Sequence, residues 1–239
     1  MRKAPRVHPT VLLAALIAGS VPSIVYAQAD FIAPNARLPI TSLPSCVDRH
    51  VVGACFDFDS GTLDNWQVAD WATGSDDYVH GTVDISSDHA ARSGRSLRLQ
   101  AKFQSVGWST VALELRADVS LADYASVRAD VHSSADSTLH LVVRFVIVAG
   151  PSWDWFETKE PLPLDPGNWS VARAPLEADA WNGPGYPEAT EARQWIASMR
   201  DVHKIMLRFE ATPDRAGAGP ADLTTISIDN IWFPESGSR

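Results

Sequence analysis

Cysteine, basic residues and recognisable catalytic motifs are all scarce in this sequence of 239 residues. The only two cysteines, Cys46 and Cys55, have a spacing that matches no zinc-ligand pattern. Acidic residues outnumber basic ones by 29 to 20, and the formal net charge of −9 at pH 7 does not favour nucleic acid or an anionic membrane as a partner. The sequence also has no glycine-rich phosphate loop, no nucleophile elbow and no HExxH motif, so the usual signals for those enzyme classes are missing.

Long apolar runs are equally rare. The stretch VLLAALIAGSV near the N-terminus is too short for a comfortable membrane span, and no second run follows it. Basic residues precede it, and the small residues Ala27 and Ala29 follow it. This order predicts a secretory signal peptide over residues 1–29, cleaved after one of these two alanines. We therefore expect a secreted or periplasmic protein. Its formal charge would be −12, because the signal removes three basic residues and no acid.

The two cysteines fit export. In an oxidising compartment, Cys46 and Cys55 predict a disulfide that closes the loop CVDRHVVGAC. The alternative is a pair of free buried thiols.

Strand patterns dominate the remainder of the chain. Residues 30–45 contain three prolines and no sustained period, which indicates a leader or linker before one domain over 46–235. Seven segments in that domain alternate or run apolar with β-branched and aromatic residues: 96–103, 110–116, 126–133, 139–148, 168–176, 203–211 and 224–233. Only residues 187–199 have a helical pattern. Many short strands and one short helix predict an all-β fold, an antiparallel β-sandwich or jelly roll.

Acids interrupt the first and last apolar strands. Asp229 lies inside TISIDNIWF, and Asp57 and Asp59 flank Phe58 in the strand that begins at Cys55. An ionised carboxylate on a buried strand is costly unless it has a partner. If the first and last strands are neighbours, these acids converge, and a hard cation such as Ca²⁺ suits them. The alternative is that they point to solvent.

Three motifs, in order, carry a family resemblance. FDFDSGTLDNW, HAARSGRSLRLQ and ISIDNIWF resemble the signature of β-sandwich carbohydrate-binding modules with a galactose-binding-like fold, which accompany secreted mannanases and glucanases. The match spans roughly residues 55–233. The resemblance implies a structural calcium. Its ligands would be Asp57 or Asp59, backbone oxygens near Ser93 and Arg95, and Asp229.

Tryptophans supply candidate sugar platforms. Four of the nine lie in stretches bounded by glycine, proline or serine: Trp108, Trp153, Trp155 and Trp181. The pair Trp153 and Trp155 would share one face of an extended chain. Indole rings suit the C–H faces of sugars. The alternative is that these rings fold back onto the sandwich.

Alternation in three strands predicts a polar sheet face. If the strands are neighbours, one charged patch contains Arg128, Asp130, His132, Arg144, Arg208 and Glu210. Arginine and carboxylate side chains offer bidentate hydrogen bonds to vicinal hydroxyls. The alternative is a solvated face with weak salt bridges.

We therefore expect a non-catalytic protein that binds a polysaccharide or oligosaccharide. An alternative is a jelly-roll polysaccharide-degrading enzyme that uses the same face. It would be a lyase with His132 beside Arg144 or Arg208, or a glycoside hydrolase with two of Asp130, Glu210 and Glu114. A protein adhesion module is a third class, which would favour an apolar patch.

Overall fold

The computed structural model describes residues 39–48, 51–69, 78–91, 94–104, 108–135, 139–184, 188–213 and 223–237. All of them belong to the compact unit Pro34–Arg239. The predicted signal peptide and most of the predicted leader lie outside the described residues, so both stay predictions.

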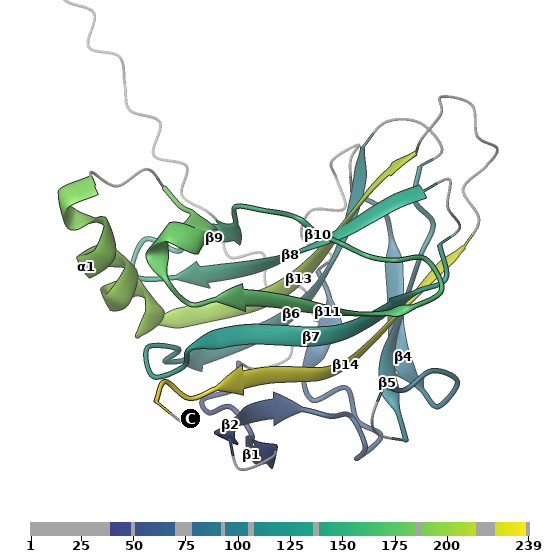
Figure 1. The fold of residues 1–239 in the computed structure, drawn as a ribbon, viewed down its shortest axis with the longest axis horizontal. Coiled ribbons are helices and arrows are strands. Elements are labelled where there is room, and N and C mark those ends of the chain that lie inside the picture. The colour runs from purple at the N-terminus through teal and green to yellow at the C-terminus, as the bar shows by residue number, and fades with distance from the viewer. Residues whose placement is uncertain are drawn as a thin grey trace, which may run out of the picture. The chain divides into compact units, whose positions relative to one another are not determined.

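The described strands form two antiparallel sheets of seven strands each. Figure 1 shows strands of both sheets. Sheet I contains β1 (Ser45–Asp48), β2 (Val51–Phe56), β4 (Gly81–Ser86), β5 (Ser96–Ala101), β7 (Ser126–Ser133), β11 (Trp169–Pro175) and β14 (Thr224–Pro234). Sheet II contains β3 (Trp66–Val68), β6 (Ser109–Val119), β8 (Leu139–Ala149), β9 (Asp154–Thr158), β10 (Leu162–Pro163), β12 (Trp181–Asn182) and β13 (Val202–Pro213). The predicted β-sandwich is confirmed, and each of the seven predicted segments forms a strand.

One hydrophobic core lies between the sheets. Sheet II contributes Leu113, Phe145 and Leu207 to it, and sheet I contributes Leu99 and Val131, all of them buried. In each of these strands the core residues alternate with residues that point outward, as a period of two requires. The outward faces of the two sheets are therefore separate surfaces.

Strand β14 lies at the centre of sheet I. It pairs with β7 along one side and with β5 and then β2 along the other. The expected contact between the first and last strands is present, since Ile231 pairs with Phe56. A register shift begins after Asp229, where Asn230 has a φ of 47°. This bulge changes the alternation, so that Ile228 and Ile231 both face the core although they are three positions apart.

Helix α1 (Glu188–Met199) matches the predicted helical segment and lies at one end of the sandwich in Figure 1. It buries Trp195 against Phe156 and Trp181, which follows the short 3₁₀ helix η1 (Ala178–Ala180). Trp181 is only 2% exposed, and its Nε1–H donates to Pro175 O at 2.8 Å. The prediction that Trp181 presents its ring to a ligand is wrong, because packing against α1 encloses it.

The hairpin of β1 and β2 carries both cysteines. In this hairpin Cys46 pairs with Gly53, which lies two positions before Cys55 on β2. No described cysteine is free. The side chain of Cys46 lies outside the described residues, so its pairing with Cys55 stays a prediction. Among the described residues, no helix is both long and apolar enough to cross a membrane.

Candidate functional site

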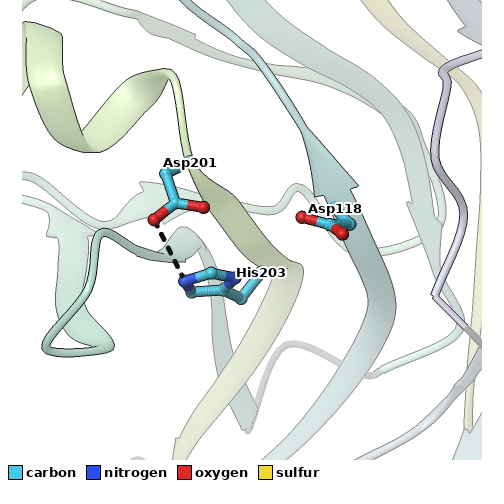
Figure 2. Close-up of side chains that lie close together, drawn as sticks. All are labelled: Asp118, Asp201 and His203. Atoms are coloured by element: carbon cyan, nitrogen blue, oxygen red, sulfur yellow. Dashed lines mark ion pairs between the residues drawn. The ribbon is translucent and has the colours of Figure 1, made fainter.

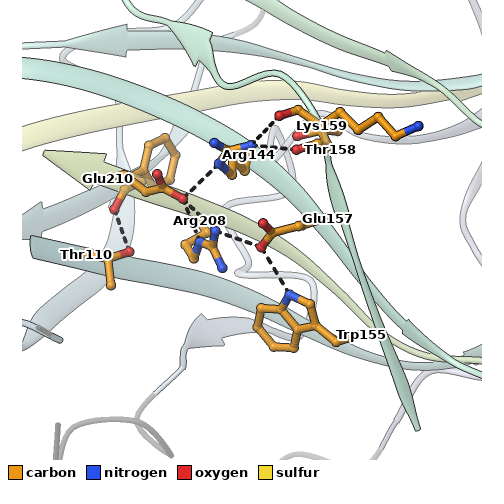
Figure 3. A network of polar contacts seen from close by, with 9 residues as sticks. Thr110, Arg144, Trp155, Glu157, Thr158, Lys159, Arg208 and Glu210 are labelled. Atoms are coloured by element: carbon orange, nitrogen blue, oxygen red, sulfur yellow. Dashed lines mark hydrogen bonds and ion pairs between the residues drawn. The ribbon is translucent and has the colours of Figure 1, made fainter. Parts of the chain in front are cut away.

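A charged network occupies the outward face of sheet II. Arg208 on β13 lies directly opposite Arg144 on β8, an arrangement that would be repulsive by itself. Glu210 Oε1 joins them, 3.1 Å from Arg144 Nε and 2.6 Å from an Arg208 terminal nitrogen. Glu157 on β9 binds the same Arg208 at 2.9 Å. We call Arg144, Glu157, Arg208 and Glu210 the Arg208 network (Figure 3).

Backbone groups also hold this network in place. Arg144 donates to the carbonyl oxygens of Thr158 at 2.6 Å and Lys159 at 2.9 Å. Its guanidinium is therefore fixed from two directions, by a carboxylate and by the end of β9 (Figure 3). Planar groups fixed in this way can present hydrogen-bond donors and acceptors to a ligand without a large ordering cost.

An indole ring lies beside the charges. Trp155 packs outward on Val146, Val148 and Met206, which form a small apolar cluster on the sheet II face. Its Nε1–H donates to Glu157 Oε2 at 3.3 Å, and the Arg208 guanidinium carbon lies 5.9 Å from its ring centroid. The ring is half-buried, so Trp155 combines an aromatic surface with adjacent polar groups. The predicted role of Trp155 is compatible with this position.

Tyr78 belongs to the same surface and was missed by sequence reasoning. It bridges to Thr110 on β6, the residue opposite Glu210. Burial raises the pKa of the Tyr78 phenol, while the positive charge of Arg208 lowers it. The negative charges of Glu210, Glu114 and Glu157 raise it further, and all of these charges belong to the outward face of sheet II. No local pattern around Tyr78 indicates this role, because only the pairing with β6 brings it there.

A second acid on this face is buried. Glu114 on β6 is 1% exposed, and it accepts a hydrogen bond from Gln67 Nε2 at 2.9 Å. Lys204 Nζ lies 3.4 Å from its other oxygen, and Arg116 Nε lies 3.6 Å away. Glu114 is thus compensated by two cations from β13 and β6. Its carboxylate is buried, so Glu114 holds the neighbouring side chains in position and is not presented to a ligand.

The predicted single patch divides between the two sheets. Arg128, Asp130 and His132 lie on β7, which pairs with β11 and β14 in sheet I. Arg144, Arg208 and Glu210 lie in sheet II. The prediction of one patch is wrong, because alternation tells which side chains share a strand face but not which strands are neighbours.

On sheet I, His132 stacks on His89 with ring centroids 4.7 Å apart. Burial, followed by the nearby His89 imidazole, lowers the pKa of His132. Asp130 accepts a hydrogen bond from Asn230 Nδ2 at 3.0 Å and is buried. His132 thus contacts the loop between β4 and β5 through His89, whereas Asp130 contacts Asn230 at the bulge of β14.

The two remaining tryptophan candidates are exposed. Trp153 is 47% exposed in the turn before β9, with a φ of 56°, and its ring stacks on His203. Trp108 is 40% exposed just before β6. Both can offer a ring surface to solvent, although neither contacts the Arg208 network in any interaction identified among the described residues.

The predicted calcium ligands meet at one loop. Asp57 and Asp59 follow β2 in a turn, instead of lying on the strand as predicted, since the chain turns at Phe58 with a φ of 60°. Gly94 N–H donates to Asp59 Oδ1 at 2.9 Å, and Ala91 N–H donates to Asp229 Oδ2 at 2.9 Å. The turn after β2 and strand β14 thus hold the same loop between β4 and β5, as the resemblance implies.

The chemistry of this region suits an oxygen-seeking ion. Asp229 is completely buried, and its Oδ1 also accepts the N–H of Asn230 at 2.8 Å. Asp57 Oδ1 accepts the N–H of Asp59 at 3.2 Å. Ser93 lies outside the described residues, and Arg95 is exposed with its guanidinium close over Gly61. Carboxylates and nearby backbone carbonyls are the donors that calcium prefers.

A different group of side chains could also hold a metal. Asp118, Asp201 and His203 place one ligand atom each within 4.8 Å of one another, and they form the one such group of three found among the described residues (Figure 2). None of the three was a sequence candidate.

No family model and no curated protein matches this chain. Solved structures do. A structure of carbohydrate-binding modules from the β-sandwich superfamily, studied for promiscuous specificity, is similar over 80% of this chain and 62% of its own, with 16% identity and a TM-score of 0.50. The family 11 carbohydrate-binding module of the Clostridium thermocellum cellulase Lic26A-Cel5E is similar over 82% of this chain and 97% of its own, with 12% identity and a TM-score of 0.49.

A third similar structure is a carbohydrate-binding module studied for specific mannan recognition, with 13% identity, a TM-score of 0.42, and coverage of 79% of this chain and 99% of its own. This chain spans less than two thirds of the first structure, at 62%. At such low identity the likeness concerns the fold alone. The chain therefore shares the β-sandwich fold of the carbohydrate-binding modules in the first of these structures.

Proposed function

We propose that this protein binds a polysaccharide or oligosaccharide without cleaving it, on the outward face of sheet II. The observation that carries the proposal is the position of the Trp155 ring against the Arg208 network. A sugar can stack its C–H face on the indole while its hydroxyls bond the fixed arginines and glutamates. The fold supports the proposal, because the similar superfamily structure is one of carbohydrate-binding modules.

The geometry argues against the lyase alternative in the form predicted, with His132 as the base beside Arg144 or Arg208. The base of a lyase must lie within reach of the same sugar as the arginine. His132 lies on sheet I and both arginines lie on sheet II. A glycoside hydrolase that uses Asp130 with Glu210 fails for the same reason. Glu114 and Glu210 share the outward face, and both are engaged with cations.

A glycan-array screen of the purified protein tests the proposal. We expect binding to one or a few polysaccharide classes, with no new reducing ends and no unsaturated products when the bound glycans are incubated with the protein. Binding that is lost in a variant of the sheet II face supports the assigned surface. Product release that persists through purification and is lost with Glu114→Gln or Glu210→Gln would replace binding with catalysis.

We further propose that a structural calcium is held by Asp229 and by Asp57 or Asp59, with backbone oxygens of the loop between β4 and β5. Two interactions support this proposal. The loop is anchored to Asp229 through Ala91 and to Asp59 through Gly94. When bound, the ion would supply positive charge between acids of two distant segments, and the protein's own N–H groups would orient the carboxylates.

Export and a Cys46–Cys55 disulfide complete the proposal. Mass spectrometry of unreduced protein from the periplasm or medium tests both. We expect an N-terminus at Gln28 or Asp30 and a mass two hydrogens below that of the reduced chain. An N-terminus that still carries the signal peptide would contradict export. Two alkylatable thiols would contradict the disulfide. A bridge of this kind stabilises mainly by restricting the unfolded chain, so reduction should lower stability without changing the sheet II face.

A further inference from the structure

Three potential metal ligands meet where β6 ends and β13 begins. Asp118 is on β6 and exposed, Asp201 lies just before β13, and His203 lies at the register shift between Val202 and Lys204. Their ligand atoms are within 4.8 Å of one another. Figure 2 shows the two carboxylates facing the same space beside the imidazole. Asp118 is at least 83 positions away from Asp201 and His203 in the sequence. Only the pairing of β6 with β13 brings it to them.

The imidazole of His203 is held by contacts at Nε2 and on its ring face. Nε2 lies 3.0 Å from Gly150 O and 3.7 Å from Asp201 Oδ2. A carbonyl oxygen only accepts, so in a neutral ring this contact requires the proton on Nε2 and leaves the lone pair of Nδ1 to bind a metal. The Trp153 ring stacks on His203 at 4.4 Å with an interplanar angle of 16°. Histidine ligands of metals characteristically donate their second N–H to a carbonyl or a carboxylate.

We propose that Asp118, Asp201 and His203 bind a divalent transition-metal ion, for which zinc is the test probe. One imidazole nitrogen with carboxylate oxygens suits zinc and its neighbours, whereas calcium takes oxygen ligands. A cation would also relieve the repulsion between two neighbouring carboxylates. Three protein ligands leave a coordination position for water or for an oxygen of a ligand. The site is separate from the calcium residues proposed above, which surround the loop between β4 and β5.

Calorimetric titration of the metal-free protein with Zn²⁺ tests this proposal. We expect one zinc ion per molecule at this site. Asp118→Asn and His203→Ala should each lower the affinity for zinc by at least roughly 10–100-fold, the loss typical when a partner of a metal ligand is changed. Because Asp118 is exposed, Asp118→Asn should fold normally. This variant therefore still tests the site if His203→Ala is unstable. The matched controls His80→Ala and Asp179→Asn, also exposed, should bind zinc like the wild type.

Two further measurements identify the location. Co²⁺ should quench tryptophan emission, and the quenching should fall in Trp153→Phe, because that ring lies on His203. Asp229→Asn changes one of the proposed calcium ligands and should leave the affinity for zinc unchanged. Zinc binding that is equally strong in Asp118→Asn and His203→Ala, or no binding by the folded wild type, would overturn the site. Loss of zinc with Asp229→Asn alone would assign the ion to the other acids instead.

Discussion

Replacement of Asp229 by alanine is expected to destabilise the protein by roughly 2–4 kcal/mol, even before any metal is considered. The carboxylate is fully buried and accepts the N–H groups of Ala91 and Asn230. Alanine leaves both donors without their acceptor and releases the loop between β4 and β5 from β14. For a domain of this size, 1 kcal/mol corresponds to about 2–4 °C, so we expect a melting temperature about 5–15 °C lower.

The calcium proposal adds a chelator dependence to this result. An ion that binds only the folded state at a hundred times its dissociation constant stabilises it by about 2.7 kcal/mol. EDTA should therefore lower the melting temperature of the wild type and leave that of Asp229→Ala unchanged. Asp123→Ala, at an exposed position, serves as the control and should respond to EDTA like the wild type. A wild type that is insensitive to EDTA and free of metal in elemental analysis would disprove the calcium, whereas an unaltered Asp229→Ala melting curve would disprove the hydrogen-bond argument.

Replacement of Trp155 by alanine is expected to weaken glycan binding by about 1–3 kcal/mol, which is about 5–150-fold in Kd. The ring is the aromatic surface adjacent to the Arg208 network, and its loss also frees Glu157 from the indole N–H. Calorimetry with the best glycan from the array screen measures the change. Trp155→Phe retains packing on Val146 and Met206, and it separates the loss of the ring surface from the loss of the N–H.

The matched control for Trp155 is Trp108→Ala. Trp108 is exposed at the start of β6 and has no identified contact with the Arg208 network among the described residues. We expect Trp108→Ala to change the Kd for the glycan less than Trp155→Ala does. Equal affinity of wild type and Trp155→Ala, with both proteins folded by circular dichroism, would remove the sheet II face from the binding proposal. A larger loss with Trp108→Ala would move the binding surface to that end of β6.

Much of the fold follows from local patterns. Alternation placed Leu113, Phe145 and Leu207 toward the core, and the structure buries all three. The pairing of the first and last apolar segments, on which the expected convergence of their acids depended, is present. Such inferences succeed because a period of two along a strand, and the cost of burying a charge, are properties of a few consecutive residues.

The sequence by itself therefore determined the seven predicted strand segments, the helix and the sandwich class. Only the tertiary structure decided which strands are neighbours. It assigned Arg128 and His132 to a different sheet from Arg208, enclosed Trp181 under α1, and brought Tyr78 to the Arg208 network. The physical reason is that strand pairing joins residues far apart in the chain. Alternation specifies the face on which a side chain lies, but the identity of its neighbours depends on the packing of the whole sandwich.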